Sequence, residues 1–364
     1  MKVAHVVCPD GMYGAERWIL MLGRHLSRRG VPLVLVTIGD SEGARDVHRR
    51  FEATGVPCVR LPHDAKISPG AISGLRRVVR EHGVDVLHTH EFKSDVFGWL
   101  ATRGLPVSLV STPHGWSSGE GLRIAAYEVV DRAFLRGFDG LYPLSLSLEA
   151  DLLARGYPRE RVHLVENAVD DEPFEDCWRA REAAGFPASG RVVFVGRVLE
   201  PKGVMELADA AARLRDLPDF RLVIAGRGAA EEALRARVAA LGIADRVEFA
   251  GYVEDVPGLL RDADAIVLPS HSEGLPRVLM EAAAAGVAIV GTDIPGIRDL
   301  VANGESGLLV PVRDPEALAD AIRRVSSDAG LRTGLLRRAR ARLLERHTGA
   351  RLARDFEAAY AALC

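Results

Sequence analysis

Short runs of Val, Ile and Leu alternate with longer stretches of helical pattern along the whole chain. The runs are continuously apolar, which is typical of parallel strands that helices bury on both faces. The sequence therefore predicts an α/β fold. The expected strands are Val3–Cys8, Leu33–Ile38, Cys58–Leu61, Val84–His88, Val107–Ser111, Gly140–Leu144 and Val162–Val165 in the first half, and Val192–Val195, Arg221–Ala225, Val247–Ala250, Ala265–Leu268, Ala288–Gly291 and Gly307–Val310 in the second.

The alternation stops between Asp170 and Gly190, where the sequence is polar and contains two prolines. Domain boundaries fall in segments of this kind. We expect a first domain at residues 1–172, a second at residues 173–345, and a C-terminal helix at residues 346–364 that packs back on the first domain. Two doubly wound, Rossmann-like sheets would then face each other across a cleft at the carboxyl ends of their strands, where such sheets bind ligands.

Length and composition agree with this organisation. The chain has 364 residues, the length of two domains, and its 48% hydrophobic and 27% charged residues exclude a disordered chain and a disulfide-stapled miniprotein. The net charge of −3 offers no basic surface for nucleic acid. The four cysteines show no metal-ligand spacing, which indicates free thiols in a reducing compartment. Since no apolar run is long enough for a signal peptide or a membrane span, we expect a cytoplasmic protein.

Two cations mark the start of the second domain. Arg197 follows the strand Val192–Val195, and Lys202 lies at the start of the next helix, between Pro201 and Gly203. Both side chains would enter the same crevice, beside a helix N-terminus that carries its own partial positive charge. The arrangement suits a diphosphate, and the alternative is two solvated surface cations.

Two glutamates eight residues apart, Glu273 and Glu281, lie in a loop and in the second turn of the helix that follows it. A spacing of very roughly 10 Å between the carboxylates is too long for paired acid–base work on one bond. It suits two hydroxyl-bearing rings at opposite ends of a diphosphate. The amides of Gly274 and Leu275 would meet an anion near the helix start. Alternatively, each glutamate only complements the helix dipole.

Taken together, these residues resemble the retaining glycosyltransferases of family four, which have the GT-B fold. The most specific part of the resemblance is residues 268–310, in which Glu273 and Glu281 form the E-x7-E motif of the family. The other matching segments are Gly196-Arg197 with Lys202-Gly203, the strand and glycine turn Val223–Gly228, Gly14-Ala15-Glu16-Arg17, Val86–His90 and Thr112-Pro113-His114-Gly115. The chain departs from the family where Ala168 stands in place of a glycine in Asn-Gly-Val-Asp.

The resemblance implies a role for each matching residue of the second domain. Arg197 and Lys202 would hold the donor diphosphate and stabilise the charge that builds on it, without a metal. Glu273 would bind hydroxyls of the donor sugar near the reacting carbon, and Glu281 would bind the ribose. Gly274 and Leu275 would complete the donor site.

In the first domain, which would be the acceptor side, Gly14 would close over the phosphates and His114 would face the donor sugar. The expected enzyme is a metal-independent, retaining hexosyltransferase without a cofactor. It would move a sugar from a nucleotide-diphosphate sugar, with UDP favoured, to an acceptor hydroxyl in glycan, glycolipid or surface-polysaccharide assembly. A nucleotide-sugar epimerase of the same fold and a nucleotide-sugar-binding protein without catalysis are the alternatives.

Other motifs in the sequence favour structural roles. Asp262-Ala263-Asp264 spells a metal-binding D-x-D, but it precedes a strand on the end opposite the expected cleft, which indicates a turn. The residues His88, His90, Glu91 and His114 lack an independent metal-ligand pattern.

Two further motifs fail a geometric requirement. Gly115–Gly119 spells G-x-S-x-G, but the serine does not follow a strand directly, as a nucleophile elbow requires. Gly226-Arg227-Gly228 lacks the third glycine of a dinucleotide fingerprint, since Glu231 stands in its place.

One basic segment, Ile72–Arg80, carries Arg76, Arg77 and Arg80 beside apolar residues. Such a segment would give weak peripheral contact with an anionic membrane, where a lipid-linked acceptor would be met. The alternative is an amphipathic helix that covers the sheet with its arginines in water.

Overall fold

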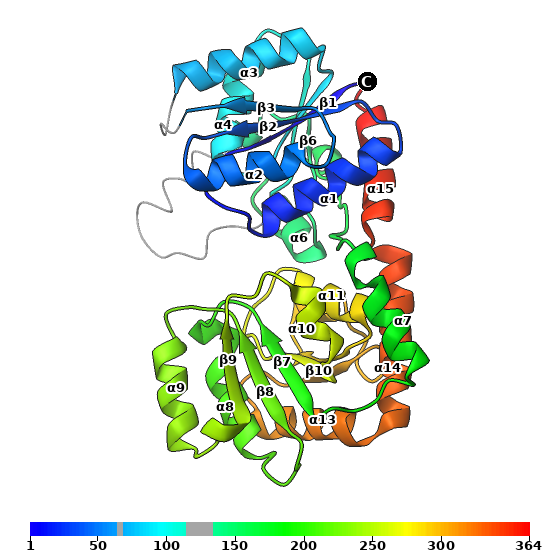
Figure 1. The fold of residues 1–364 in the computed structure, drawn as a ribbon. Coiled ribbons are helices and arrows are strands. Elements are labelled where there is room, and N and C mark those ends of the chain that lie inside the picture. Colours follow the sequence, from blue (N-terminus) through cyan, green and yellow to red (C-terminus); the bar gives the residue numbers. More distant parts are fainter. Residues whose placement is uncertain (64–67, 114–133) are drawn as a thin grey trace. The chain divides into compact units, whose positions relative to one another are not determined.

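The computed structural model describes residues 1–63, 68–113 and 134–364, which form two units (Figure 1). The first unit comprises Met1–Ala168 and Gly349–Cys364, and the second comprises Val169–Thr348. Each unit contains one six-stranded parallel sheet with helices around it. The predicted pair of Rossmann-like domains is therefore confirmed.

The first unit is a doubly wound sheet. Its elements are β1 (Val3–Val7), α1 (Gly14–Arg28), β2 (Leu33–Ile38), α2 (Glu42–Glu52), β3 (Cys58–Leu61), α3 (Pro69–His82), β4 (Val86–Thr89), α4 (Phe92–Thr102), β5 (Ser108–Ser111), β6 (Gly140–Leu141), α6 (Leu146–Ala154) and α15 (Gly349–Ala361). The strands lie in the order β3-β2-β1-β4-β5-β6, so the order reverses between β1 and β4. Trp18 of α1 and Phe356 of α15 belong to one apolar cluster, whereas Leu75 of α3 and Phe97 of α4 belong to another.

The second unit repeats this topology. Its elements are α7 (Glu175–Ala183), β7 (Arg191–Val195), α8 (Val204–Ala212), β8 (Arg221–Ala225), α9 (Glu231–Ala240), β9 (Val247–Gly251), α10 (Val256–Arg261), β10 (Ala265–Leu268), α11 (Arg277–Ala285), β11 (Ala288–Thr292), α12 (Pro295–Arg298), β12 (Leu308–Val310), α13 (Pro315–Ser327) and α14 (Ala329–Arg346). The strand order is β12-β11-β10-β7-β8-β9, so the reversal falls between β7 and β10. Val169, which opens the unit, forms a parallel bridge with Thr348, which closes it.

One predicted strand, Val162–Val165, is wrong. Only Val162 forms a bridge, to Leu141 of β6, although His163 N–H and Val165 N–H donate to the carbonyls of Leu141 and Pro143. A parallel ladder needs a return bond from residue 143, and proline has no N–H to give. The ladder therefore stops at the sheet edge.

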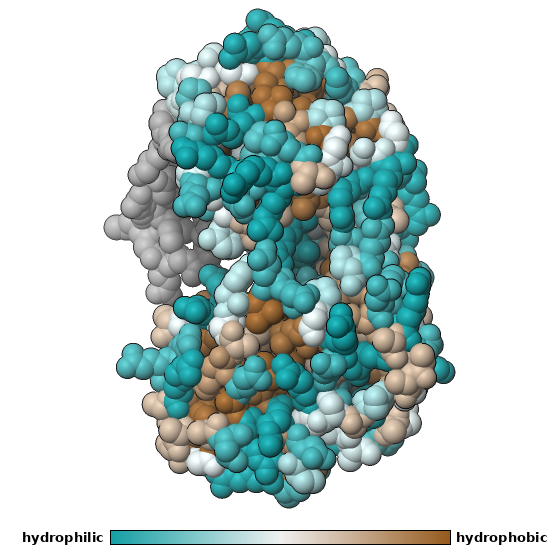
Figure 2. Space-filling view, viewed as in Figure 1, coloured by the Kyte–Doolittle hydropathy of each residue, from teal (hydrophilic) through white to brown (hydrophobic). Residues whose placement is uncertain are grey.

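Hydrophilic residues predominate on the face of each unit that Figure 2 shows, and apolar residues emerge there in smaller patches. Among the described residues, no helix is long and apolar enough to cross a membrane. On α3, Arg77 and Arg80 are exposed, but Arg76 is half-buried and donates to the carbonyls of Ala101 and Arg103 at 2.9 and 2.8 Å. Arg76 therefore holds α3 to the end of α4.

The last helix of the chain, α15, lies beside α1 in the first unit (Figure 1). The two helices approach closely, because a Cβ at Gly349 would lie 2.5 Å from Nε2 of His25. Phe356 and Tyr360 of α15 are fully buried. An ion pair between Arg29 and Glu357 closes the contact at the surface.

Three buried histidines connect α15 to the sheet. Nδ1 of His5 on β1 lies 2.9 Å from Nε2 of His90, and His88 on β4 contacts the hydroxyls of Tyr360 at 2.6 Å and Thr112 at 2.8 Å. The Tyr360 hydroxyl also lies 3.4 Å from Nε2 of His5. Burial lowers the pKa of His5 to about 3, so this ring is neutral at neutral pH.

We expect the stability of the fold to depend on pH through His5. The folded-state pKa is depressed from 6.5 to about 3, so the stability that the neutral ring contributes is complete above pH 6.5 and declines as pH falls. Relative to His5→Asn, the wild type should lose about 2–3 kcal/mol of unfolding free energy between pH 7.5 and pH 4.5, measured by urea titration. Tyr360→Phe, which removes a partner in the same network, should cost about 1 kcal/mol at both pH values. Parallel pH profiles of the wild type and His5→Asn would contradict this assignment.

Candidate functional site

The candidate site of the second unit lies where its strand order reverses. Ligands of doubly wound sheets bind outside the carboxyl ends of the strands at this point. The loop after β7, residues 196–203, and the loop after β10, residues 269–276, follow the two strands that flank the reversal. The first loop carries Arg197 and Lys202, and the second carries Glu273.

Lys202 and Glu273 form an ion pair across these loops. Nζ of Lys202 lies 2.6 Å from Oε1 of Glu273, and the Lys202 and Glu273 side chains are 23% and 11% exposed. The hydroxyl of Ser270 donates to the same carboxylate oxygen at 2.7 Å. Two donors therefore hold the same carboxylate oxygen of Glu273 in place.

Close backbone packing holds the two loops together. Gly203 has a φ of 66°, and a Cβ there would lie 2.0 Å from the carbonyl oxygen of Pro269, so only glycine fits. The N–H of His271 donates to the carbonyl of Pro201 at 2.8 Å. These contacts bring the end of the first loop against the start of the second, which places Lys202 next to Glu273.

Several residues that support the two loops were not predicted from the sequence. His271 Nε2 lies 2.8 Å from Oε1 of Glu206 in the first turn of α8, and Thr292 at the end of β11 donates to the carbonyl of Ser270 at 2.5 Å. A Cβ at Gly296 would lie 1.9 Å from the carbonyl oxygen of Gly274, so the start of α12 supports the second loop. A glycine directly after Pro295 was the available signal for this close approach.

The other predicted donor-site residues of the second unit belong to the same two loops and to α11. Arg197 is exposed, and within the described part of the chain no hydrogen bond or ion pair joins its side chain to Lys202 or Glu273. Glu281 on α11 is 16% exposed and lies 3.9 Å from Arg277. Gly274 is exposed and Leu275 half-buried. Their amides precede α11, whose N-cap is Pro276.

In the first unit, Gly14 begins α1 and is exposed. A Cβ there would meet no atom within 4 Å, so the packing of the unit does not require this glycine. The predicted residue His114 lies outside the described residues.

Two carboxyl groups lie near the reversal of the first sheet: Glu16 on α1 is buried, and Glu91, the N-cap of α4, is half-buried. Burial, with nearby Glu16 and Asp10, raises the pKa of Glu91 to about 7, and burial also raises the pKa of Glu16. Tyr13 N–H donates to Glu16 at 3.0 Å, which fixes this carboxyl group at the start of α1. Titratable groups with perturbed pKa values concentrate at functional sites. No local sequence pattern predicts these raised pKa values, because they arise from burial.

Two motifs that favoured structural roles, Asp262–Asp264 and Gly226–Gly228, make structural contacts, whereas Gly115–Gly119 lies outside the described residues. The carboxylate of Asp264 accepts hydrogen bonds from the N–H groups of Ser189 and Gly190 at 2.6–2.9 Å, which fixes the start of β10. A Cβ at Gly226 or Gly228 would lie 1.8 or 2.1 Å from a carbonyl oxygen of the β7 loop, so these glycines serve packing.

The histidine cluster in the structure differs from the group considered in the sequence, because His5 joins His88 and His90. Nitrogen atoms of His5, His88 and His90 lie within 4.8 Å of one another, which is close enough for a metal ion. Both ring nitrogens of His5 and of His88 already have partners in the network that binds Tyr360.

Comparison with known proteins gives two family matches that together span most of the chain. Residues 178–342 match the family described as glycosyl transferases group 1, and residues 13–168 match the glycosyl transferase 4-like domain. A D-inositol 3-phosphate glycosyltransferase of Acidothermus cellulolyticus is 34% identical, over 92% of this chain and 82% of that protein. A phosphatidyl-myo-inositol mannosyltransferase of Mycolicibacterium smegmatis is 30% identical, over 80% of this chain and 76% of that protein.

Solved structures show the same fold. Anabaena Alr3699/HepE in complex with UDP and glucose is 20% identical, with a TM-score of 0.82 and full coverage of both chains. The family matches, the relatives and the paired Rossmann-like sheets agree with the motifs in the sequence. The chain belongs to the family-four glycosyltransferases and has the GT-B fold.

Proposed function

We propose that this glycosyltransferase moves a sugar, with retention at the anomeric carbon, from a nucleoside-diphosphate sugar to an acceptor hydroxyl. UDP is the favoured nucleotide. The observation that carries the proposal is the pair formed by Lys202 and Glu273 at the reversal between β7 and β10. It offers a cation for phosphate and a carboxylate for hydroxyl groups within one hydrogen-bond distance.

In the proposed reaction, the bond between the anomeric carbon and the diphosphate oxygen breaks, and the acceptor oxygen bonds to the same face of that carbon. The acceptor proton passes to the leaving phosphate. Lys202 and Arg197 stabilise the charge that develops on the diphosphate, a task for which fixed cations are effective. Glu273 binds hydroxyls of the donor sugar, and Glu281 binds the ribose. Gly14 and His114 would contribute from the first unit.

The acceptor is proposed to be a saccharide or a lipid-linked saccharide. The relatives named for inositol phosphate and phosphatidylinositol make these two compounds the first acceptors to test. Peripheral contact with an anionic membrane would involve the exposed Arg77 and Arg80 of α3. Arg76 would not take part, because it bonds to the end of α4.

The first prediction concerns the cation at the diphosphate. Lys202→Ala should lose about 2–4 kcal/mol of transition-state stabilisation, a fall of about 30- to 1000-fold in kcat/KM. Release of nucleoside diphosphate, measured with and without acceptor, gives the rate and separates transfer from epimerisation or binding alone. Arg235→Ala, an exposed cation on α9, is the control.

Activity should persist in EDTA. Complete loss in EDTA with recovery in Mn²⁺ or Mg²⁺ would overturn the metal-independent mechanism.

A second prediction separates the two glutamates. Glu281→Ala should weaken binding of UDP itself, because the ribose loses its partner. Glu273→Ala should leave UDP binding nearly unchanged and lower kcat, because it acts on the sugar. Calorimetry with UDP and steady-state kinetics measure the two effects, with the exposed Glu232→Ala as a control. Equal losses of UDP affinity in both variants would show that the roles are wrongly assigned.

A third prediction is that Lys202 and Glu273 act as one unit. Either Lys202→Ala or Glu273→Gln leaves the other half of a largely buried pair uncompensated, so the double variant should be more stable than the sum of the single losses predicts. We expect a coupling of about 1–2 kcal/mol in unfolding free energy. The exposed pair of Arg235 and Glu231 should give a coupling below about 0.5 kcal/mol. Additive effects at Lys202 and Glu273 would rule out an ion pair in solution.

A further inference from the structure

One short helix, α11, carries a central part of the proposed donor site. It bears Glu281 and follows the loop that contains Glu273. Its N-cap is Pro276, which has no side-chain group that could bond to the N–H groups of the first turn. A helix start of this kind is open to an anion. Contacts elsewhere must therefore fix the position of the helix.

The opposite end of α11 is held by two buried arginines from other helices. Arg340 of α14 donates through Nη1 to the carbonyl of Ala284 at 2.5 Å, and Arg181 of α7 donates through Nε to the carbonyl of Gly286 at 2.9 Å. Arg340 and Arg181 are 7% and 6% exposed. The last carbonyls of a helix lack partners within it, and cations there complement the helix dipole. The C-terminal end of α11 is thus bonded on two sides.

Each arginine also contacts a second helix. Arg340 forms an ion pair with Glu175 in the first turn of α7, and its guanidinium lies 4.5 Å from the centre of the Trp178 ring. Arg181 donates through Nη1 to the carbonyl of Arg261, the last residue of α10, at 2.9 Å. In Figure 1, α7 and α14 lie beside α11. The two side chains therefore join four helices of the second unit at the end of α11.

Packing along α11 leaves a task for these polar bonds. Residues 282–285 are four buried alanines, whose methyl groups interlock little with neighbouring helices. Gly286, which ends the helix, has a φ of 76°, and a Cβ there would lie 2.9 Å from a ring carbon of Trp178. Hydrogen bonds are directional, so the bonds to Ala284 and Gly286 restrict the sliding and rotation that alanines permit.

The bonded end of α11 lies close to the glutamate that would bind the ribose. Glu281 precedes Ala284 by three residues, which is about 4.5 Å along the helix axis, or nearly one turn. A movement of the Ala284 carbonyl therefore moves Glu281 with it. In a site that orients its substrate, a displacement of about 1 Å can cost up to about 100-fold in rate.

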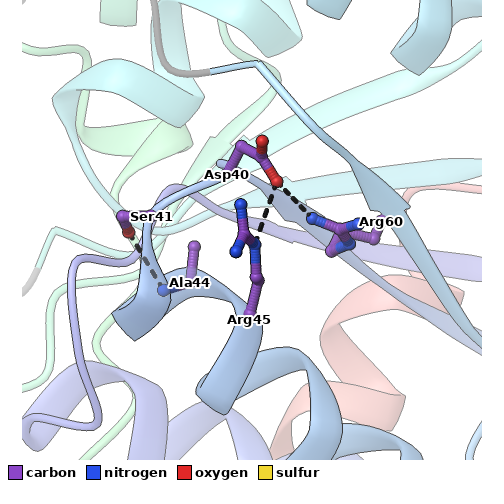
Figure 3. Close-up of polar contacts among 5 residues, drawn as sticks. All are labelled: Asp40, Ser41, Ala44, Arg45 and Arg60. Atoms are coloured by element: carbon purple, nitrogen blue, oxygen red, sulfur yellow. Dashed lines mark hydrogen bonds and ion pairs between the residues drawn. The ribbon is translucent and has the colours of Figure 1, made fainter.

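Arg340 differs in burial from the arginines of a comparable cluster in the first unit. There, Arg45 and Arg60 donate to one carboxylate oxygen of Asp40 at 3.2 and 2.7 Å (Figure 3). The Arg60 and Asp40 side chains are 33% and 41% exposed, and ion pairs of this kind contribute little. Burying the guanidinium of Arg340 costs desolvation, which its bonds offset only in a narrow range of geometries. Arg340 thus favours one position of α11.

We propose that Arg340, together with Arg181, is a positioning residue of the donor site, which holds α11 by its C-terminal end and thereby aligns Glu281 with the donor. The part that Glu281 plays toward the donor rests on the proposed function. The fixation of α11 does not, because it needs no nucleotide.

Two variants of the full chain, Arg340→Met and Arg332→Met, test the proposal. Arg332 is also a buried arginine of α14 that donates to backbone carbonyls, but its bonds go to Val325, Ser326 and Phe186. Both variants should lower the urea midpoint of unfolding. Only Arg340→Met should weaken UDP binding, by about fivefold or more in calorimetry, because only this variant releases the helix that bears Glu281. Only Arg340→Met should speed hydrogen exchange of the α11 amides.

A double-variant cycle with Glu281 separates positioning from general destabilisation. In the Glu281→Ala background, Arg340→Met should change UDP affinity by less than about twofold, because the group that it positions is gone. Arg340→Lys keeps the charge and one bond, and should recover part of the affinity. Arg60→Met, which breaks an arginine contact of the first unit, should leave UDP affinity and α11 exchange unchanged.

Each contrary result has one meaning. Equal losses of UDP affinity in Arg340→Met and Arg332→Met, or an undiminished loss in the Glu281→Ala background, overturn the positioning role. Unchanged exchange of α11 in Arg340→Met overturns the fixation of the helix. Should Arg340→Met fail to fold, Arg340→Lys takes its place in both measurements. A wild type that binds neither UDP nor GDP contradicts the proposed function, and the exchange of α11 then decides alone whether Arg340 holds the helix.

Discussion

The close approach of the two loops that follow β7 and β10 brings a lysine and a glutamate of the second unit into contact. Gly203 allows this approach because a side chain there would collide with the carbonyl of Pro269. The backbone bond from His271 to Pro201 then fixes the register of the loops. Lys202 meets Glu273 as a consequence, since its side chain lies one residue from the point of contact.

The two sheets share one topology but have different electrostatics at the point where the strand order reverses. The first unit carries Glu16 and Glu91, whose pKa values are raised, so Glu91 is partly protonated near neutral pH. The second unit carries Lys202 with a carboxylate that it neutralises. A protonated carboxyl group can donate a hydrogen bond to a hydroxyl, whereas an ammonium group attracts phosphate. The same fold therefore has a different electrostatic environment at the strand reversal of each unit.

The apolar core of the first unit includes side chains from the last helix of the chain, α15. Phe356 and Tyr360 of α15 belong to the same apolar cluster as Trp18 and Tyr142. In the histidine network beneath them, His5 remains neutral at neutral pH because burial penalises its charged form. Packing and hydrogen bonding in this region are thus coupled to a helix that follows the whole of the second unit in sequence.

The sequence by itself determined most strands, their parallel arrangement and the residue types of the candidate donor site, because apolar runs and helix signals are local. It gave the boundaries of β2, β3, β8 and β10 as they are in the structure, and failed at Val162–Val165, where a proline on the neighbouring strand stops the ladder. Tertiary structure alone decided that Lys202 pairs with Glu273, that Arg76 bonds to the end of α4, and that the pKa of Glu91 rises to about 7. Each of these depends on burial and on contacts between elements far apart in sequence, and no local pattern encodes either.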